Sequence, residues 1–261
     1  MFAENLATEE VFRRALGWDM ATLDREYGSF LDRRVRASAA HLDFTRLKER
    51  DENPKGVSKE HLTAVLEKNP DDFFANLALG RLLRKEKSNG PAEVYLKKAE
   101  KLFPEFVEPD NPYQILAEIY LEEKRENEAL PELLGWSRFD ENSVWPLKRA
   151  AEIYRNRKDW PGAVKVLDLS VYIDPYDPEV HSMLGEAAVE AGNWPAAVSA
   201  YQVLVGLAPT DPAGAHFNLA RAWLGYGKKP EAKRETLRAL EIAPSYEKAQ
   251  QLLLKLSGSS P

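Results

Sequence analysis

Apolar residues recur along most of the chain with the spacing of amphipathic helices, and the helical stretches come in pairs. Residues 178–211 show the pattern most clearly, with apolar stripes at Val180, Leu184, Ala187, Ala188 and Ala191 and then at Ala197, Val198, Tyr201 and Leu204. Gly192 and Asn193 separate the two stripes. This spacing predicts two helices joined by a tight turn.

The helix pair repeats every 34 or 35 residues in four registers that share one phase. They are Pro175, Pro209 and Pro244; Ala129, Ala163, Ala197 and Ala232; Ala117, Ala151, Gly185 and Ala220; and Tyr113, Leu147, His181 and His216. A period of this length is typical of helical solenoids. The small residues are expected at close helix crossings, because helices about 8–10 Å apart leave no room there for a large side chain.

At these positions the sequence resembles the tetratricopeptide repeat family. The resemblance implies an all-α fold, a right-handed α-α superhelix of about five repeats with a helical N-terminal region and a C-terminal capping helix. The expected units are residues 71–106, 110–143, 144–177, 178–211 and 213–246. Residues 247–256 continue the helical phase as the cap, and residues 257–261 form an expected flexible tail.

Several positions depart from the family's pattern. About two extra residues are expected in the first unit, around Lys87–Pro91. Pro131 lies within the second helix of the second unit, which is therefore expected to start late. Trp136 and Leu204 occupy a position that usually holds a small residue, so Trp136 is expected to be buried, and the neighbouring helices are expected to be further apart there or shifted.

Residues 1–69 lack the repeat. A short helix opens near Thr8, a longer one follows Asp19, residues 51–56 form a polar break, and residues 57–68 resemble a lone second helix of a repeat. With Ala-Leu-Gly-Trp at residues 15–18 and Leu-Asp-Arg-Glu-Tyr at residues 23–27, residues 3–35 also resemble the closing helices of bacterial peptidase-MA-like (gluzincin) domains, although the family's His-Glu-x-x-His signature is absent. That resemblance implies that the chain is the C-terminal part of a longer protein. The alternative is a helical cap unrelated to any peptidase.

The composition of the chain excludes or disfavours several classes of protein. The 261 residues include no cysteine, which excludes disulfides and cysteine-ligated zinc. The net charge of −6 argues against a nucleic-acid partner. No apolar run approaches the ~18 residues of a membrane-spanning helix, and no signal-peptide pattern is visible. Both a cytoplasmic and a periplasmic location stay open.

No catalytic motif, cofactor site or metal site is indicated. His181 and His216 occupy the same repeat position, but that position normally holds a bulky packing residue, which favours a structural role. The glycines and lysines of residues 225–229 lack the spacing of a phosphate-binding loop and are expected in the turn between two helices.

The family resemblance implies a concave groove, lined by the first helix of each unit, that binds peptides. Helical phase places in it the candidate residues Glu118, Trp145, Lys148, Arg149, Glu152, Glu186, Phe217, Asn218 and Arg221. Glu118, Glu152 and Glu186 hold one position in successive units and form an expected acidic ladder. The ladder is either a site for a partner with basic and acidic groups or a solvated face with internal ion pairs.

The expected groove positions of the first unit are apolar: Ala75, Leu79, Leu82 and Leu83. Phe217 and Leu224 play a similar part in the fifth unit. An exposed stripe of this kind needs cover, from residues 1–69 or from a partner. The Lys and Asn set with which some members of the family bind a C-terminal carboxylate fits no three consecutive units, which disfavours a chaperone-tail ligand.

These features predict a non-catalytic scaffold that binds a protein or peptide in its groove. Two alternatives stay open: a substrate- or partner-positioning appendage of a peptidase-MA-like metallopeptidase, and a self-assembling homo-oligomer.

Overall fold

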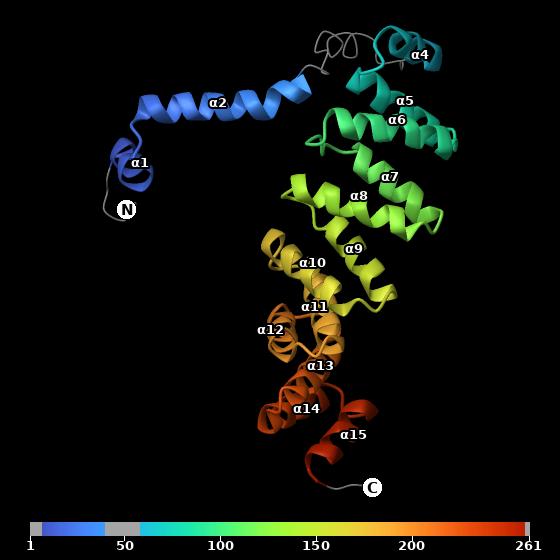
Figure 1. The fold of residues 1–261 in the computed structure, drawn as a ribbon. Helices are drawn as coiled ribbons and strands as arrows, with labels where there is room; N and C mark the ends of the chain where they lie inside the picture. The colour runs from blue at the N-terminus through green and yellow to red at the C-terminus, as the bar shows by residue number, and fades with distance from the viewer. Residues whose placement is uncertain (1–6, 40–57, 259–261) are drawn as a thin grey trace. The chain divides into compact units, whose positions relative to one another are not determined.

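The computed structural model describes residues 7–39 and 58–258, and within these ranges all regular structure is helical (Figure 1). The prediction of an all-α repeat fold is therefore confirmed. None of the described helices combines the length and the apolar character needed to cross a membrane.

The chain divides into two units, residues 1–116 and 117–261, with the boundary inside α7 (Pro112–Glu122). The helices before α7 are α1 (Thr8–Leu16), α2 (Met20–Ala39), α4 (Lys59–Lys68), α5 (Phe73–Lys85) and α6 (Asn89–Leu102). Those after it are α8 (Glu126–Phe139), α9 (Trp145–Asn156), α10 (Trp160–Ile173), α11 (Pro178–Glu190), α12 (Trp194–Gly206), α13 (Pro212–Gly225), α14 (Lys229–Ile242) and α15 (Glu247–Leu256).

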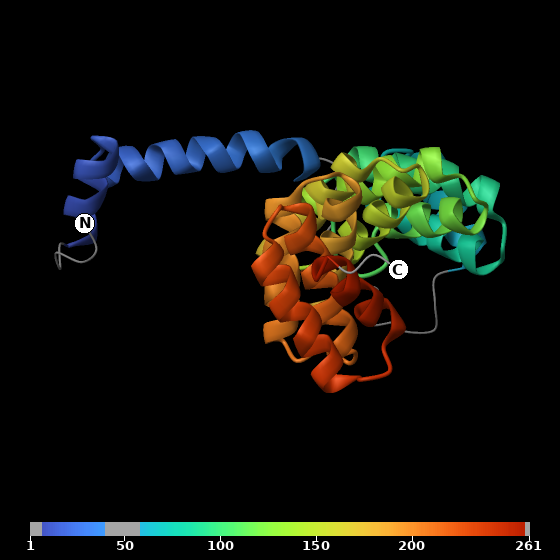
Figure 2. The same cartoon turned by 90° about the horizontal axis from the view of Figure 1, so that it is seen from below.

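In the second unit each helix from α8 to α15 packs on the next one along the chain, in the order that Figures 1 and 2 show. Short polar residues begin several of these helices. The side chains of Asp159, Asp177, Asn193 and Asp211 accept hydrogen bonds from backbone N–H groups of the first turn that have no partner within the helix. A proline at the first or second helical position follows each of these caps, where its missing N–H costs nothing.

The turn between the two helices of each pair contains one residue in the left-handed backbone conformation. It is Lys87, Lys124, Lys158, Gly192 or Gly227, with φ between 57° and 80°. Glycine adopts this conformation without steric cost, whereas lysine does not. The turn is thus the same in all five pairs although its residue type changes.

The small residues lie at the helix crossings. Ala117, Ala129, Ala163, Ala197 and Ala220 are at most 1% exposed. A Cβ atom on Gly185 would lie 2.6 Å from ring carbons of Tyr201, which packs there from α12. A larger side chain at Gly185 would therefore have to displace a buried aromatic ring.

The first pair differs from the sequence expectation in its register. Helix α5 begins at Phe73, two residues later than the unit start at residue 71. A Cβ atom added to Gly80 would lie 2.7 Å from the Leu96 side chain, so Gly80 lies at a close helix crossing. Gly80 comes twelve residues before the fully buried Ala92, and the same interval separates Gly185 from Ala197. The expectation of two extra residues around Lys87–Pro91 is therefore wrong, because α5 and its turn have the standard length.

The same shift corrects the apolar stripe of α5. Ala75, Leu79 and Leu83 are 2%, 1% and 4% exposed, and Leu82 is half-buried. A two-residue shift turns an α-helix by about 200°, so residues expected on the outer face belong to the core. Helix α4 packs against α5, with its Leu62 buried.

The expected late start of the helix that contains Pro131 is also wrong. Helix α8 begins at Glu126 and continues through Pro131. Proline removes the hydrogen bond to the carbonyl of Asn127, but both residues are exposed, so water can solvate that carbonyl. The buried Ala129, Leu133 and Trp136 hold the helix in place, and the Trp136 Nε1 donates to Asp140 Oδ2 at 2.9 Å.

Helices α1 and α2 form as expected, and Asp19 Oδ1 accepts a hydrogen bond from the backbone N–H of Thr22 at 2.8 Å in the first turn of α2. The apolar side chains of Tyr27, Phe30 and Leu31 on α2 are exposed. The polar break expected at residues 51–56 lies outside the described residues.

Candidate functional site

The nine predicted groove residues all lie in the second unit, on α7, α9, α11 and α13, which are the first helices of their pairs. We call the surface they occupy the groove face: Glu118, Trp145, Lys148, Arg149, Glu152, Glu186, Phe217, Asn218 and Arg221. All nine are half-buried or exposed, so none is part of the helix–helix core.

Charged residues of the groove face on α9 and α11 form ion pairs within the chain. Arg149 Nη1 lies 2.7 Å from Glu152 Oε2. Arg155 Nη1 lies 3.7 Å from Glu186 Oε2, which links α9 to α11. Two members of the acidic ladder therefore have cationic partners within the chain. Each pair is largely exposed, so each contributes at most about 1 kcal/mol to stability.

Lys148 makes a more buried link between these helices. Its Nζ contacts Asp177 Oδ2 at 3.3 Å and donates a second hydrogen bond to the Glu179 carboxylate. Partial burial acts to lower the pKa of Lys148, but the hydrogen bond to Glu179 and the charge of Asp177 outweigh it, so the pKa is raised. Lys148 is thus positively charged, and its charge is neutralised internally.

Trp145, the predicted groove aromatic, is half-buried at the start of α9. Its ring packs against Trp136, with ring centroids 5.3 Å apart, and the Arg149 guanidinium lies 5.5 Å from its ring centroid. These contacts hold the indole in one position. Trp145 therefore offers a fixed apolar surface rather than a mobile one.

The two equivalent histidines have different partners. His181 Nε2 lies 2.8 Å from the carbonyl oxygen of Pro175, and His216 Nδ1 lies 2.8 Å from Oε2 of the buried Glu235. Within residues 7–39 and 58–258, no group of three or more potential metal-ligating side chains comes together. Each histidine thus has one hydrogen-bond partner within the chain.

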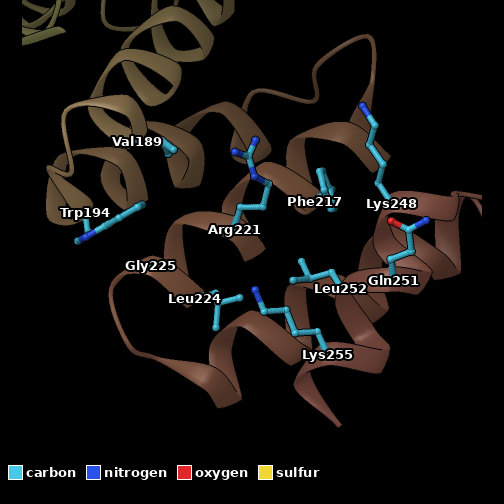
Figure 3. A pocket seen from close by; sticks show the side chains of 10 residues that line it. All are labelled: Val189, Trp194, Phe217, Arg221, Leu224, Gly225, Lys248, Gln251, Leu252 and Lys255. Atoms are coloured by element: carbon cyan, nitrogen blue, oxygen red, sulfur yellow. The ribbon is translucent and has the colours of Figure 1, made fainter. Parts of the chain in front are cut away.

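The groove face ends in a pocket of about 480 Å³ between α11, α13 and α15, with Trp194 of α12 at its margin (Figure 3). The lining residues are Val189, Trp194, Phe217, Arg221, Leu224, Gly225, Lys248, Gln251, Leu252 and Lys255. Half of them are large apolar residues, and no carboxylate is among them. A pocket of this size falls in the range that holds small ligands or a few peptide side chains.

Close packing fixes two walls of this pocket. A Cβ on Gly225 would lie 2.3 Å from the indole of Trp194, so the absence of a side chain at the end of α13 makes room for that ring. Phe217 packs on Tyr246, which precedes α15, with ring centroids 5.1 Å apart. The pocket therefore has preformed aromatic sides.

The three cations of the pocket differ from those on α9. Arg221, Lys248 and Lys255 form no ion pair and no side-chain hydrogen bond with any described residue. Figure 3 shows the Lys255 side chain extending from α15 toward α13, which carries Arg221 and Leu224. An unpaired positive charge thus borders an apolar floor.

The sequence predicts Phe217, Arg221 and Leu224 at groove positions but not the remaining residues of the pocket. It predicts α15 only as a capping helix. A signal was present, because Lys248, Gln251, Leu252 and Lys255 are spaced three, four and seven residues apart and so share one helix face.

Comparison with known proteins supports the same class of fold. Residues 182–247 match the tetratricopeptide repeat family model. Over 72 residues the chain is 39% identical to a TPR repeat-containing protein of Picosynechococcus sp., covering 28% of this chain and 17% of that protein. Over 101 residues it is 30% identical to the heat shock protein sti1 homolog of Schizosaccharomyces pombe, covering 39% of this chain and 17% of that protein.

Among solved structures, the fold resembles that of YrrB, a TPR protein with an unusual peptide-binding site. The TM-score is 0.53 at 18% sequence identity, and the match covers 74% of this chain and 98% of YrrB. The fold is therefore that of a tetratricopeptide repeat superhelix, and the repeat match supports a tetratricopeptide repeat protein. The family match does not extend to residues 3–35, whose likeness to peptidase-MA-like domains stays a prediction.

Proposed function

We propose that this protein is an interaction scaffold that binds a segment of another protein along the groove face. The observation that carries the proposal is the groove-face pocket itself, which has preformed aromatic walls on helices fixed by close packing. Rigid aromatic and arginine side chains around such a pocket are typical of protein interfaces.

The repeat fold supports the proposal physically. Each helix pair contacts only its neighbours, so the surface residues of the first helices are free of the folding core and extend over several pairs. Trp145, Asn218 and Arg221 are spread over α9 and α13 in this way. A partner bound in extended or helical form would contact several helices at once.

Site-specific photocrosslinking tests the location without assuming the chemistry of the partner. The photoreactive amino acid p-benzoylphenylalanine replaces Arg149 or Asn218 on the groove face, and matched controls carry it at the exposed Lys165 or Lys233 on second helices. Full-length variants are irradiated in extracts of the source cells. We expect partner adducts from the groove positions and not from the controls; adducts only from the controls would overturn the proposal.

The acidic ladder has its own test. Changing Glu118, Glu152 and Glu186 together to lysine removes its negative charge and breaks the pairs with Arg149 and Arg155. If the ladder contacts the partner, the adduct formed from Asn218 is lost while the variant still folds, as judged by circular dichroism. An unchanged adduct yield would show that the ladder only pairs with its own arginines.

A further inference from the structure

We infer that the pocket between α11, α13 and α15 accepts an acidic segment of a partner protein that carries one large apolar side chain. The inference rests on the proposed function, and it adds the location and the chemistry of the bound segment.

The first observation is the positive charge around the pocket. The chain carries a net charge of −6, yet Arg221, Lys248 and Lys255 gather around one pocket that has no carboxylate in its lining. On α9 of the same unit, Lys148, Arg149 and Arg155 all have acidic partners. The cations on α9 are thus paired within the chain, whereas the three around this pocket face solvent, and an anionic ligand would complement them.

Shape provides the second step. Leu224 and Leu252 line the space between α13 and α15, while Phe217 and Trp194 stand at its sides (Figure 3). Leu224 and Leu252 are only partly buried, so an apolar group entering the pocket would cover them. A segment with acidic residues alone would leave this floor exposed to water, and an apolar segment alone would leave the three cations without partners.

The arrangement of the cations favours a short peptide segment over a single small anion. Lys248 and Lys255 are seven residues apart on α15, which places them about 10 Å apart along the helix axis. Arg221 lies on the opposite helix, α13. Carboxylates on either side of an apolar side chain can meet the two lysines where they stand, whereas one compact anion would require both long side chains to converge on a single point.

A display experiment with the full chain tests this inference. A phage library of random 12-residue peptides is selected against the wild-type protein, and the enriched peptides are made with a fluorescein label for anisotropy titrations. We expect enrichment of Asp and Glu around one Leu, Phe or Trp. The triple variant R221E/K248E/K255E should weaken Kd at least tenfold, and the milder R221Q/K248Q/K255Q should weaken it less.

The matched control reverses three exposed lysines on second helices that line no part of the pocket, K165E/K229E/K233E. It makes the same change in net charge and should leave Kd within about twofold. L224E, which places a carboxylate on the apolar floor, should abolish binding of the same peptides. Urea unfolding of each variant checks that it folds.

The outcomes separate this inference from the proposed function. The inference is overturned if the selected peptides lack acidic residues, or if they bind R221E/K248E/K255E as tightly as wild type; the photocrosslinking result can then still support a scaffold. The inference is supported if the peptides bind K165E/K229E/K233E as tightly as wild type and lose binding to R221E/K248E/K255E. If the library yields no binder while groove-face adducts form in extracts, the short acidic segment is wrong and a larger folded partner replaces it.

Discussion

The substitution Gly185→Ala tests the close helix crossings on which the stacked pairs depend. A methyl group there would lie 2.6 Å from ring carbons of Tyr201, against about 3.5–4.0 Å for an ordinary carbon–carbon contact. Tyr201 is only 4% exposed, so its ring has little room to move away. Overpacking in such a site costs about 1–3 kcal/mol, and the better helix propensity of alanine returns about 1 kcal/mol. We therefore expect a net loss of up to about 2 kcal/mol in the free energy of unfolding.

Urea unfolding followed by far-ultraviolet circular dichroism measures this loss. Gly206→Ala is the matched control, because its new Cβ would meet no atom within 4 Å and should be neutral or slightly stabilising. In a Tyr201→Leu background the cost of Gly185→Ala should fall by about 1 kcal/mol, because the ring that causes the clash is gone. Equal midpoints for Gly185→Ala and Gly206→Ala would refute the reasoning.

Three further predictions follow from the same contacts. Ala163→Trp, at a position 1% exposed, should overpack a helix crossing and lower the melting midpoint by an amount corresponding to about 1–3 kcal/mol or more; an unchanged midpoint would count against the repeat register. Gly192 (φ 70°) and Lys158 (φ 57°) occupy the same turn position. Gly192→Lys should therefore lower the free energy of unfolding by about 1 kcal/mol, and Lys158→Gly should raise it by up to about 1 kcal/mol. Urea midpoints of the two variants that move in the same direction would contradict this. Burial raises the pKa of Tyr201 to about 12, above the ~10 of an unfolded chain. The stability that its neutral phenol contributes is therefore complete below pH 10 and is lost as the pH rises toward 12. In alkaline urea titrations, Tyr201→Phe should reduce the fall in unfolding free energy by up to about 1.4 kcal/mol per pH unit, and an unaltered slope would falsify this.

The fold could be predicted from the sequence because its cause is local and repeated. Small residues at a 34-residue period mark helix crossings, and each crossing needs only its neighbours. The errors arose where that signal was weak. Lys87 occupies a turn position that glycine marks only in the last two pairs. Asn76 stands where the later pairs have Tyr113, Leu147, His181 and His216, so the predicted register of the first pair lies two residues too early.

The pocket was harder to predict, because it depends on contacts between segments distant in sequence. Arg221 and Phe217 have the right helical phase, but their phase does not reveal that Lys255 extends from α15 toward α13, as Figure 3 shows. The acidic ladder shows the reverse case. Phase alone aligned Glu152 and Glu186, and the structure adds that each has an arginine partner.

The central claim is that the first helices of the second unit, together with α15, form the surface that receives a partner segment. Hydrogen exchange of the full chain, followed by mass spectrometry with and without a saturating selected peptide, tests it most directly. We expect slower exchange in α11, α13 and α15, with the exchange of α10, α12 and α14 changed much less. Protection confined to α10, α12 and α14 would contradict it.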